Sequence, residues 1–252
     1  MTVAQASILF VAGGLASAIN SVAGGGSLIT FPALRFGFKL DSVVANATNT
    51  VSLWPGSLGG AFGFANLLPK TKPYLKLLAL PTLVGSAFGA WLLISTPKST
   101  FDAIVPFLIL LAALLLLLQP QIKAFVQRGG RTLSPAVGVA LQLIVAIYGG
   151  YFGAGMGIMM LAAFALYMDG TIHELNAVKT WLGTIVNLVA SILFVGAGKV
   201  ALDFALFLTL GSICGGYLGA RYSQGLHPEK LRKSIAVYGI AMAVYYFLRT
   251  RG

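Results

Sequence analysis

Long uncharged stretches divide this chain of 252 residues, and they limit the folds that it can adopt. A membrane-spanning helix needs about 20 mostly apolar residues, and most of the stretches have that length. Only 9% of the residues are charged and 58% are hydrophobic, which excludes both a soluble globular domain and a disordered chain. We therefore predict an all-α, polytopic integral membrane protein with about eight membrane segments. The uncharged stretches are residues 1–34, 42–69, 77–97, 103–122, 132–168, 180–198, 204–220 and 234–248.

Two of these stretches, residues 1–34 and 132–168, are too long for one straight helix. Each contains a glycine cluster: Gly24-Gly25-Gly26 in the first, and five glycines from Gly149 to Gly157 in the second. A glycine inside a helix costs about 1 kcal/mol relative to alanine, so each cluster predicts a helix that is broken at membrane depth or a re-entrant hairpin. Broken backbone at that depth must be buried in protein or line a wet cavity.

The two halves of the chain resemble each other at an offset of about 130 residues. Residues 46–50 (NATNT) match residues 176–180 (NAVKT), and the glycine clusters correspond after a shift of one residue. A further match consists of two Gly-x-x-x-Gly pairs, whose spacing predicts close packing of helices. These pairs are Gly85 with Gly89 and Gly215 with Gly219.

The repeat divides the chain into a first membrane repeat, residues 1–119, and a second, residues 135–252, joined by a basic linker over residues 120–134. With Lys179 set aside, eight full crossings divide the basic residues nine to seven between the two sides. A re-entrant second break divides them ten to six, with the linker on the richer side. Because Lys and Arg are enriched in cytoplasmic loops, we predict inverted repeats in the plasma membrane, with the linker in the cytoplasm.

Duplicated halves with a broken helix in corresponding positions are the sequence pattern of a transporter binding site. The two breaks would meet near the midplane, where free N–H groups and the positive dipole ends of half-helices suit an anion. Amides and hydroxyls beside the breaks can donate hydrogen bonds to its oxygens. The predicted substrate-binding residues are Asn20, Gly24, Gly25, Gly26, Ser27, Asn46, Thr48, Asn49, Gly155, Gly157, Asn176, Lys179 and Thr180.

Lys179 is the sharpest signal in this set, because it lies between two otherwise uncharged stretches and a charge inside a membrane is costly. In one interpretation it faces the cavity and attracts the anion. In the other, the membrane segment begins near Lys179, which reaches the interface or pairs with Glu174. The Asn and Thr side chains leave a similar choice between binding substrate and joining helices through hydrogen bonds.

At these residues the chain resembles the sulfite exporter TauE/SafE family, whose members are small membrane permeases for sulfur-containing anions. The resemblance rests on residues 24–34 (GGGSLITFPAL) followed by residues 45–49 (ANATN). It recurs as residues 153–157 (GAGMG) followed by residues 176–180, and it covers nearly the whole chain. It implies a permease that exports sulfite, an organosulfonate or a similar oxyanion.

The sequence supports other classes of function less well. A passive anion channel built on the same breaks, or an importer of a related small organic anion, is the alternative. No HExxH, G-x-S-x-G or Walker A motif is present, so we expect no enzyme and no catalytic residues. One cysteine and two histidines lead us to expect no metal and no cofactor. The predicted partners are the anion and the lipid bilayer, without nucleic acid, and the packing faces would permit a homodimer.

Overall fold

The computed structural model describes residues 1–22, 25–128, 133–222 and 228–251. These residues form helices and connecting turns without a strand, which confirms the predicted all-α class. A π-helix, η1 (Ala33–Gly37), and a short 3-10 helix, η2 (Ala65–Leu67), accompany the α-helices. The α-helices are α1 (Val3–Val22), α2 (Ser27–Pro32), α3 (Ser42–Gly63), α4 (Leu68–Ser95), α5 (Lys98–Arg128), α6 (Pro135–Tyr151), α7 (Met156–Tyr167), α8 (Ile172–Gly196), α9 (Leu202–Tyr222) and α10 (Pro228–Arg251).

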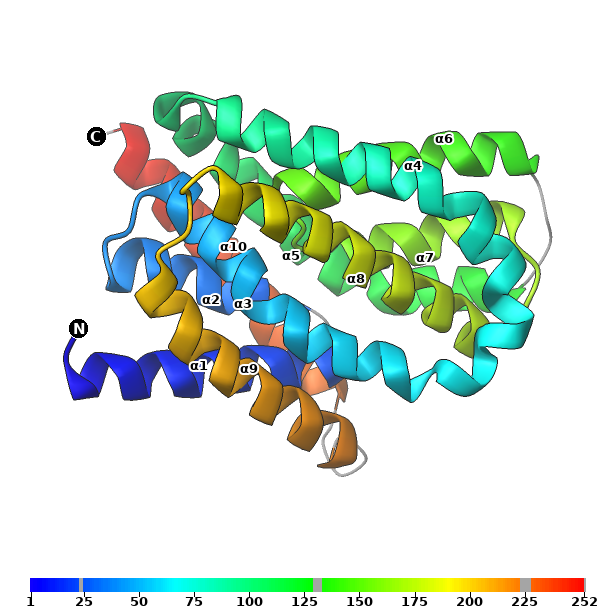
Figure 1. Cartoon of the computed structure of the whole chain (residues 1–252), viewed down its shortest axis with the longest axis horizontal. Coiled ribbons are helices and arrows are strands. Elements are labelled where there is room, and N and C mark those ends of the chain that lie inside the picture. Colours follow the sequence, from blue (N-terminus) through cyan, green and yellow to red (C-terminus); the bar gives the residue numbers. More distant parts are fainter. Residues whose placement is uncertain (23–24, 129–132, 223–227, 252) are drawn as a thin grey trace.

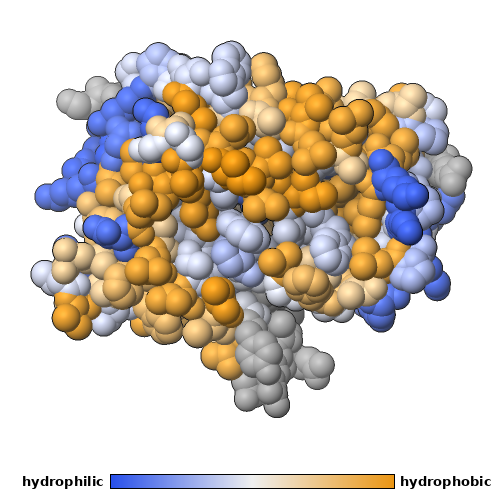
Figure 2. Space-filling model, in the orientation of Figure 1, coloured by the Kyte–Doolittle hydropathy of each residue, from blue (hydrophilic) through white to orange (hydrophobic). Residues whose placement is uncertain are grey.

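The surface of the molecule is suited to lipid. Four stretches of the described helices are long and apolar enough to cross a membrane: Val3–Asn20, Ala65–Ser95, Lys98–Arg128 and Ile172–Gly196. Large apolar side chains lie exposed on such helices, as Leu80 does with 69% of its surface. In Figure 2, hydrophobic residues cover much of the middle of the visible face, and hydrophilic residues gather toward its left and right ends. An apolar surface of this extent belongs in a bilayer, so the chain is an integral membrane protein.

The two over-long stretches are broken at their glycine clusters, as predicted. α1 ends at Val22 and α2 begins at Ser27, while α6 ends at Tyr151 and α7 begins at Met156. The two helices of each pair pack against each other. Even when the 5 residues of η1 are added to its 6, α2 is shorter than the roughly 17 residues that a crossing needs, and so is α7 with 12 residues. Each glycine-broken segment is therefore a hairpin, and the two hairpins start from opposite ends of the molecule in Figure 1.

Close contacts between helix backbones hold the hairpins against the other half of the chain. α6 packs against α4, and α1 packs against α9. A Cβ atom at Gly85 of α4 would lie 2.7 Å from the carbonyl oxygen of Leu143 on α6. A Cβ atom at Gly215 of α9 would overlap the backbone of Gly14 on α1. These glycines thus serve close helix packing, as their spacing predicts.

The main helix contacts join one predicted repeat to the other. The first helix of each packs against the third membrane segment of the other, and the matching helices α3 and α8 pack against each other, as do α5 and α10. A two-fold relation between inverted halves would produce this pattern, and the division into repeats stays a prediction. α5 continues to Arg128, so residues 120–128 of the predicted linker are helical, and residues 129–132 lie outside the described part.

Candidate functional site

The first break is closed by a side chain from the helix before it. The amide of Asn20 accepts a hydrogen bond from the backbone nitrogen of Gly26 at 2.7 Å, which ties the end of α1 to the start of α2. Gly25 has a φ of 88°, a left-handed conformation that a residue without a side chain adopts most readily. Ser27 begins α2, and Gly24 lies outside the described residues.

The second break uses glycine in the same way. Gly153 and Gly155 have φ values of 79° and 78°, so the chain turns sharply between α6 and α7. The backbone nitrogens of Phe152 and Gly153 both donate to the carbonyl oxygen of Tyr148, at 2.9 and 3.2 Å. The hydroxyl of Tyr148 donates to the carbonyl oxygen of Ala154. Tyr148 therefore fixes the shape of this turn.

Both breaks pack on the same part of α5. A Cβ atom at Gly25 would lie 2.9 Å from the side chain of Leu116, and one at Gly155 would lie 3.2 Å from Cα of Ala112. Residues four apart lie on neighbouring turns of one helix face. This position is near the middle of Lys98–Arg128, a segment long enough to span a membrane. The two breaks thus come close together near the centre of the apolar layer.

A buried polar chain runs from the first break to α3. The hydroxyl of Thr30 donates a hydrogen bond to Oδ1 of Asn49, and it lies 3.2 Å from the carbonyl oxygen of Gly26. Thr30 and Asn49 are both buried, so each stabilises the other against the cost of an unpaired polar group. Thr30 was not among the site residues predicted from the sequence, although a hydroxyl one turn after the glycine cluster in a largely apolar segment was a signal for it.

Asn46 connects α3 to the second break. Its Nδ2 donates to the carbonyl oxygen of Tyr151, the last residue of α6, at 3.0 Å. Its Oδ1 is buried and has no hydrogen-bond partner, which is uncommon in native proteins. Thr48 lies elsewhere, because its hydroxyl accepts a hydrogen bond from the backbone nitrogen of Ala201 at 3.0 Å. Thr48 therefore fastens α3 to the segment before α9.

Lys179 extends from α8 across the start of α7. A Cβ atom at Gly157 would lie 3.3 Å from Cδ of Lys179, so the absence of a side chain there makes room for the lysine. The ammonium group donates to Oδ1 of Asn176 at 2.9 Å. Thr180 turns its hydroxyl to the carbonyl oxygen of Asn176 at 2.7 Å, which is a bond within its own helix.

The structure does not contain the pairing of Lys179 with Glu174 that one interpretation included. Glu174 caps the start of α8 with Thr171 and forms an ion pair with Lys70, whose Nζ lies 3.6 Å from Oε1. Lys179 pairs with no acidic side chain among the described residues. Its charge is therefore balanced only by the dipole of a neutral amide, in a helix long enough to span the membrane.

The predicted site residues form two groups instead of one. The methyl group of Thr180 would lie 3.9 Å from a Cβ atom at Gly60 of α3. Gly60 is eleven residues beyond Asn49, which corresponds to about 16 Å along a helix that rises 1.5 Å per residue. Asn20, Gly26 and Asn49 thus belong to the first group, and Gly157, Asn176, Lys179 and Thr180 to the second. Asn49 and Thr180 are therefore too far apart for one small anion to contact both in this conformation.

The chain is similar to known proteins over almost its whole length. The family model of the sulfite exporter TauE/SafE matches residues 9–246. A probable membrane transporter protein, ORF9, of Sinorhizobium sp is 28% identical over 243 residues, which is 94% of this chain and 90% of the relative. A probable membrane transporter protein of Haemophilus influenzae is 27% identical over 235 residues, covering 93% and 91% of the two chains.

The probable membrane transporter protein YfcA of Escherichia coli K12 is 26% identical over 245 residues, covering 97% and 90% of the two chains. No solved structure gives a significant match. The match of the family model to nearly the full length agrees with the glycine-broken hairpins and the apolar surface described above. The chain therefore belongs to the sulfite exporter TauE/SafE family of membrane transporters.

Proposed function

We propose that this transporter exports a small sulfur-containing anion, such as sulfite or an organosulfonate. The observation that carries the proposal is the placement of Lys179. Its ammonium group has no acidic partner among the described residues, and its side chain lies against Gly157 at the start of α7. A charge is retained at membrane depth where it has a function, since inserting it costs at least about 2.5 kcal/mol.

Two sources of positive potential coincide at this point. Gly157 is the second residue of α7, whose first turn carries the positive end of the helix dipole. An ammonium group has three hydrogen-bond donors, and Asn176 accepts one of them. Two donors of Lys179 are thus left for the oxygens of sulfite or a sulfonate.

The first group of polar residues is better suited to letting the anion pass than to binding it tightly. Asn20 and Asn49 are neutral amides, which can contact an anion without holding it as strongly as a full charge does. The membrane potential supports the outward direction, because it drives a singly charged anion out of a cell with about 2.3 kcal/mol per 100 mV.

Flux measurements in proteoliposomes test this proposal. We expect the purified chain to move sulfite and a simple organosulfonate anion such as methanesulfonate, with a rate that saturates as their concentration rises. Chloride and sulfate serve as competing anions, and liposomes without protein serve as the blank. A steady ionic current that does not saturate would favour a channel instead. The absence of flux of any sulfur anion, under gradients in both directions, would reject the substrate.

The orientation in the membrane is part of the same proposal. Both hairpins return to the end from which they start, so the connections near residues 66–76, 119–134 and 221–233 share one side and hold ten Lys and Arg residues. The other side holds six. The more basic side faces the cytoplasm under the positive-inside rule, which places both chain termini outside.

Single-cysteine labelling checks this orientation. In a Cys214→Ser background, we expect a cysteine at Thr2 to react with a membrane-impermeant maleimide on intact cells. A cysteine at Ser134 should react only after the membrane is opened. Both positions are exposed in the structure, so lysed cells supply the control for reactivity. Labelling of the Ser134 variant on intact cells would reverse the orientation.

A further inference from the structure

The segment that leaves the first hairpin has an unusual backbone. It continues from α2 as the π-helix η1 (Ala33–Gly37), and π-helices are rare and frequent at functional sites. Two residues later Lys39 has a φ of 57°, although a side chain disfavours this left-handed conformation. Such strain persists only where the surroundings hold the chain in place.

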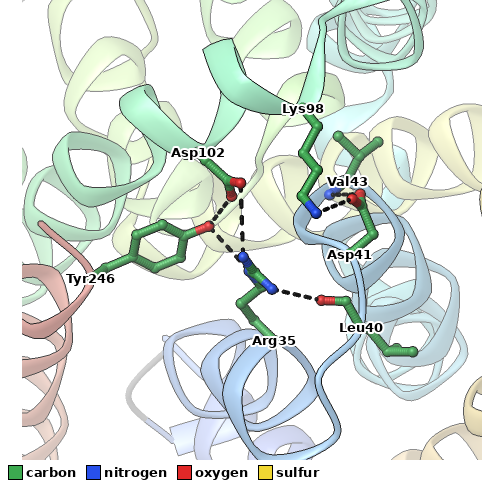
Figure 3. A network of polar contacts seen from close by, with 7 residues as sticks. All are labelled: Arg35, Leu40, Asp41, Val43, Lys98, Asp102 and Tyr246. Atoms are coloured by element: carbon green, nitrogen blue, oxygen red, sulfur yellow. Dashed lines mark hydrogen bonds and ion pairs between the residues drawn. The ribbon is translucent and has the colours of Figure 1, made fainter. Parts of the chain in front are cut away.

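Arg35 supplies that support, as Figure 3 shows. Its Nη1 donates to the carbonyl oxygen of Leu40 at 3.2 Å, which fixes the loop that carries Lys39. Its Nη2 lies 3.7 Å from Oδ2 of Asp102 at the start of α5. Its Nε donates to the hydroxyl of Tyr246 on α10 at 3.4 Å, and Tyr246 in turn donates to Asp102.

The loop has a second anchor on its other side. Asp41 accepts a hydrogen bond from the backbone nitrogen of Val43 at 2.9 Å and thereby caps α3. The same carboxylate lies 3.3 Å from Nζ of Lys98. Arg35 and Lys98 are thus each paired with an acid, whereas Lys39 has none among the described residues.

These elements enclose a cavity at the end of the molecule where both termini lie. Its volume is about 290 Å³, close to the lower limit of about 300 Å³ for small-molecule pockets, so it suits a small ligand. Three cationic side chains line it and no acidic one does. The lining residues are Arg35, Phe36, Lys39, Tyr246 and Arg249.

Arg249 lines one wall of this cavity, where two aromatic side chains hold it in position. Its guanidinium carbon lies 5.6 Å from the centre of the Phe36 ring, within the range of a cation–π contact. Its Nη1 donates to the hydroxyl of Tyr245 at 2.8 Å. Among the described residues no acid forms an ion pair with Arg249. Its guanidinium group therefore keeps its positive charge and has further N–H donors for a ligand. Asp102 balances Arg35, and the cavity therefore has an excess of about two positive charges.

We infer that this cavity is a binding site for an oxyanion, held by Lys39 and Arg249 in a frame built by Arg35. A guanidinium group such as that of Arg249 matches phosphate and sulfonate oxygens through a pair of hydrogen bonds, and the ammonium group of Lys39 supplies the second cation. The group bound is a sulfonate or sulfite from solution or the phosphate of an anionic lipid headgroup, since both reach a membrane surface. Binding here goes beyond the transport proposal, because it needs no movement across the membrane.

Binding to the purified full-length chain in detergent tests the site. The soluble probes are methanesulfonate and sulfite, and the lipid probe is phosphatidylglycerol compared with phosphatidylcholine in mixed micelles. The readout is the rise in unfolding midpoint with probe concentration. The variant is Lys39→Gln/Arg249→Gln. The control, Lys72→Gln/Lys199→Gln, removes the same charge from residues that neither line the cavity nor anchor its loop.

We expect the variant to weaken binding of the effective probe about tenfold or more, because two charge-assisted contacts are lost. The control should change it less than about threefold. An effect with phosphatidylglycerol alone identifies the lipid phosphate as the ligand, and an effect with the soluble probes alone identifies the free anion. If the variant and the control lost affinity for the probe equally, the binding would come from the overall positive charge of the molecule, and the proposed site would be wrong. The absence of binding of any probe would also overturn it. Should the double variant not fold, Lys39→Gln alone gives the same comparison with Lys199→Gln.

Discussion

Replacing Lys179 with alanine is expected to lower sulfite or sulfonate flux in proteoliposomes about ten- to hundredfold, the equivalent of one or two lost charge-assisted hydrogen bonds. The lysine has no acidic partner among the described residues and faces the start of α7 through Gly157. Without it, the second break keeps the positive end of the helix dipole, which is worth only about 0.3–1 kcal/mol. The measurement is the initial rate of anion flux at equal amounts of inserted protein.

A structural role would give a different result. Because an unpaired charge inside a membrane is unfavourable, Lys179→Ala should unfold no more easily than the unmodified chain. Lys72→Ala is the matched control, since Lys72 is exposed near the start of α4 and should leave the flux unchanged. A Lys179→Ala protein that folds normally and moves the anion at the original rate would remove Lys179 from the proposed site.

The breaks could be predicted from the sequence because their cause is local. Clustered glycines such as Gly153 and Gly155 lower helix stability and permit the left-handed backbone that the turn requires. The close contact at Gly215 was predictable for a similar reason, since its spacing pattern has one common structural use. In both cases a few neighbouring residues determine the outcome.

The grouping of the site residues depended on information that a sequence match does not contain. Asn49 and Lys179 occupy corresponding positions in the repeat, which suggests a shared site. α3 and α8, however, pack against each other in opposite directions. Corresponding positions near the start of two antiparallel helices lie toward opposite ends of the pair, so the repeat separates these residues.

The network around Arg35 was not predictable from local pattern either. Arg35, Asp102 and Tyr246 come from three distant parts of the chain, and each reads as an ordinary residue at the end of an uncharged stretch. Their contact requires that α5 and α10 pack together and that Arg35, within the π-helix, lies beside both of them. Tertiary packing alone brings such groups within reach of one another.

Replacing Gly215 with alanine is expected to destabilise the folded chain by about 3 kcal/mol, the upper end of the range for overpacking. The new Cβ atom would overlap the backbone of Gly14 on α1, so α1 and α9 would have to separate along their contact. Inside a bilayer no hydrophobic effect compensates for this, because helix association there depends on close packing. The measurement is reversible unfolding in mixed micelles at increasing dodecyl sulfate, compared at equal protein concentration.

Gly59→Ala provides a control of opposite sign. Gly59 lies inside α3, and no atom comes within 4 Å of a Cβ atom built there. The same substitution should therefore stabilise the chain by up to about 1 kcal/mol, through helix propensity alone. If both variants changed stability in the same direction, propensity rather than helix contact would govern these glycines. A Gly215→Ala protein as stable as the unmodified chain would show that the first hairpin does not depend on close contact between α1 and α9.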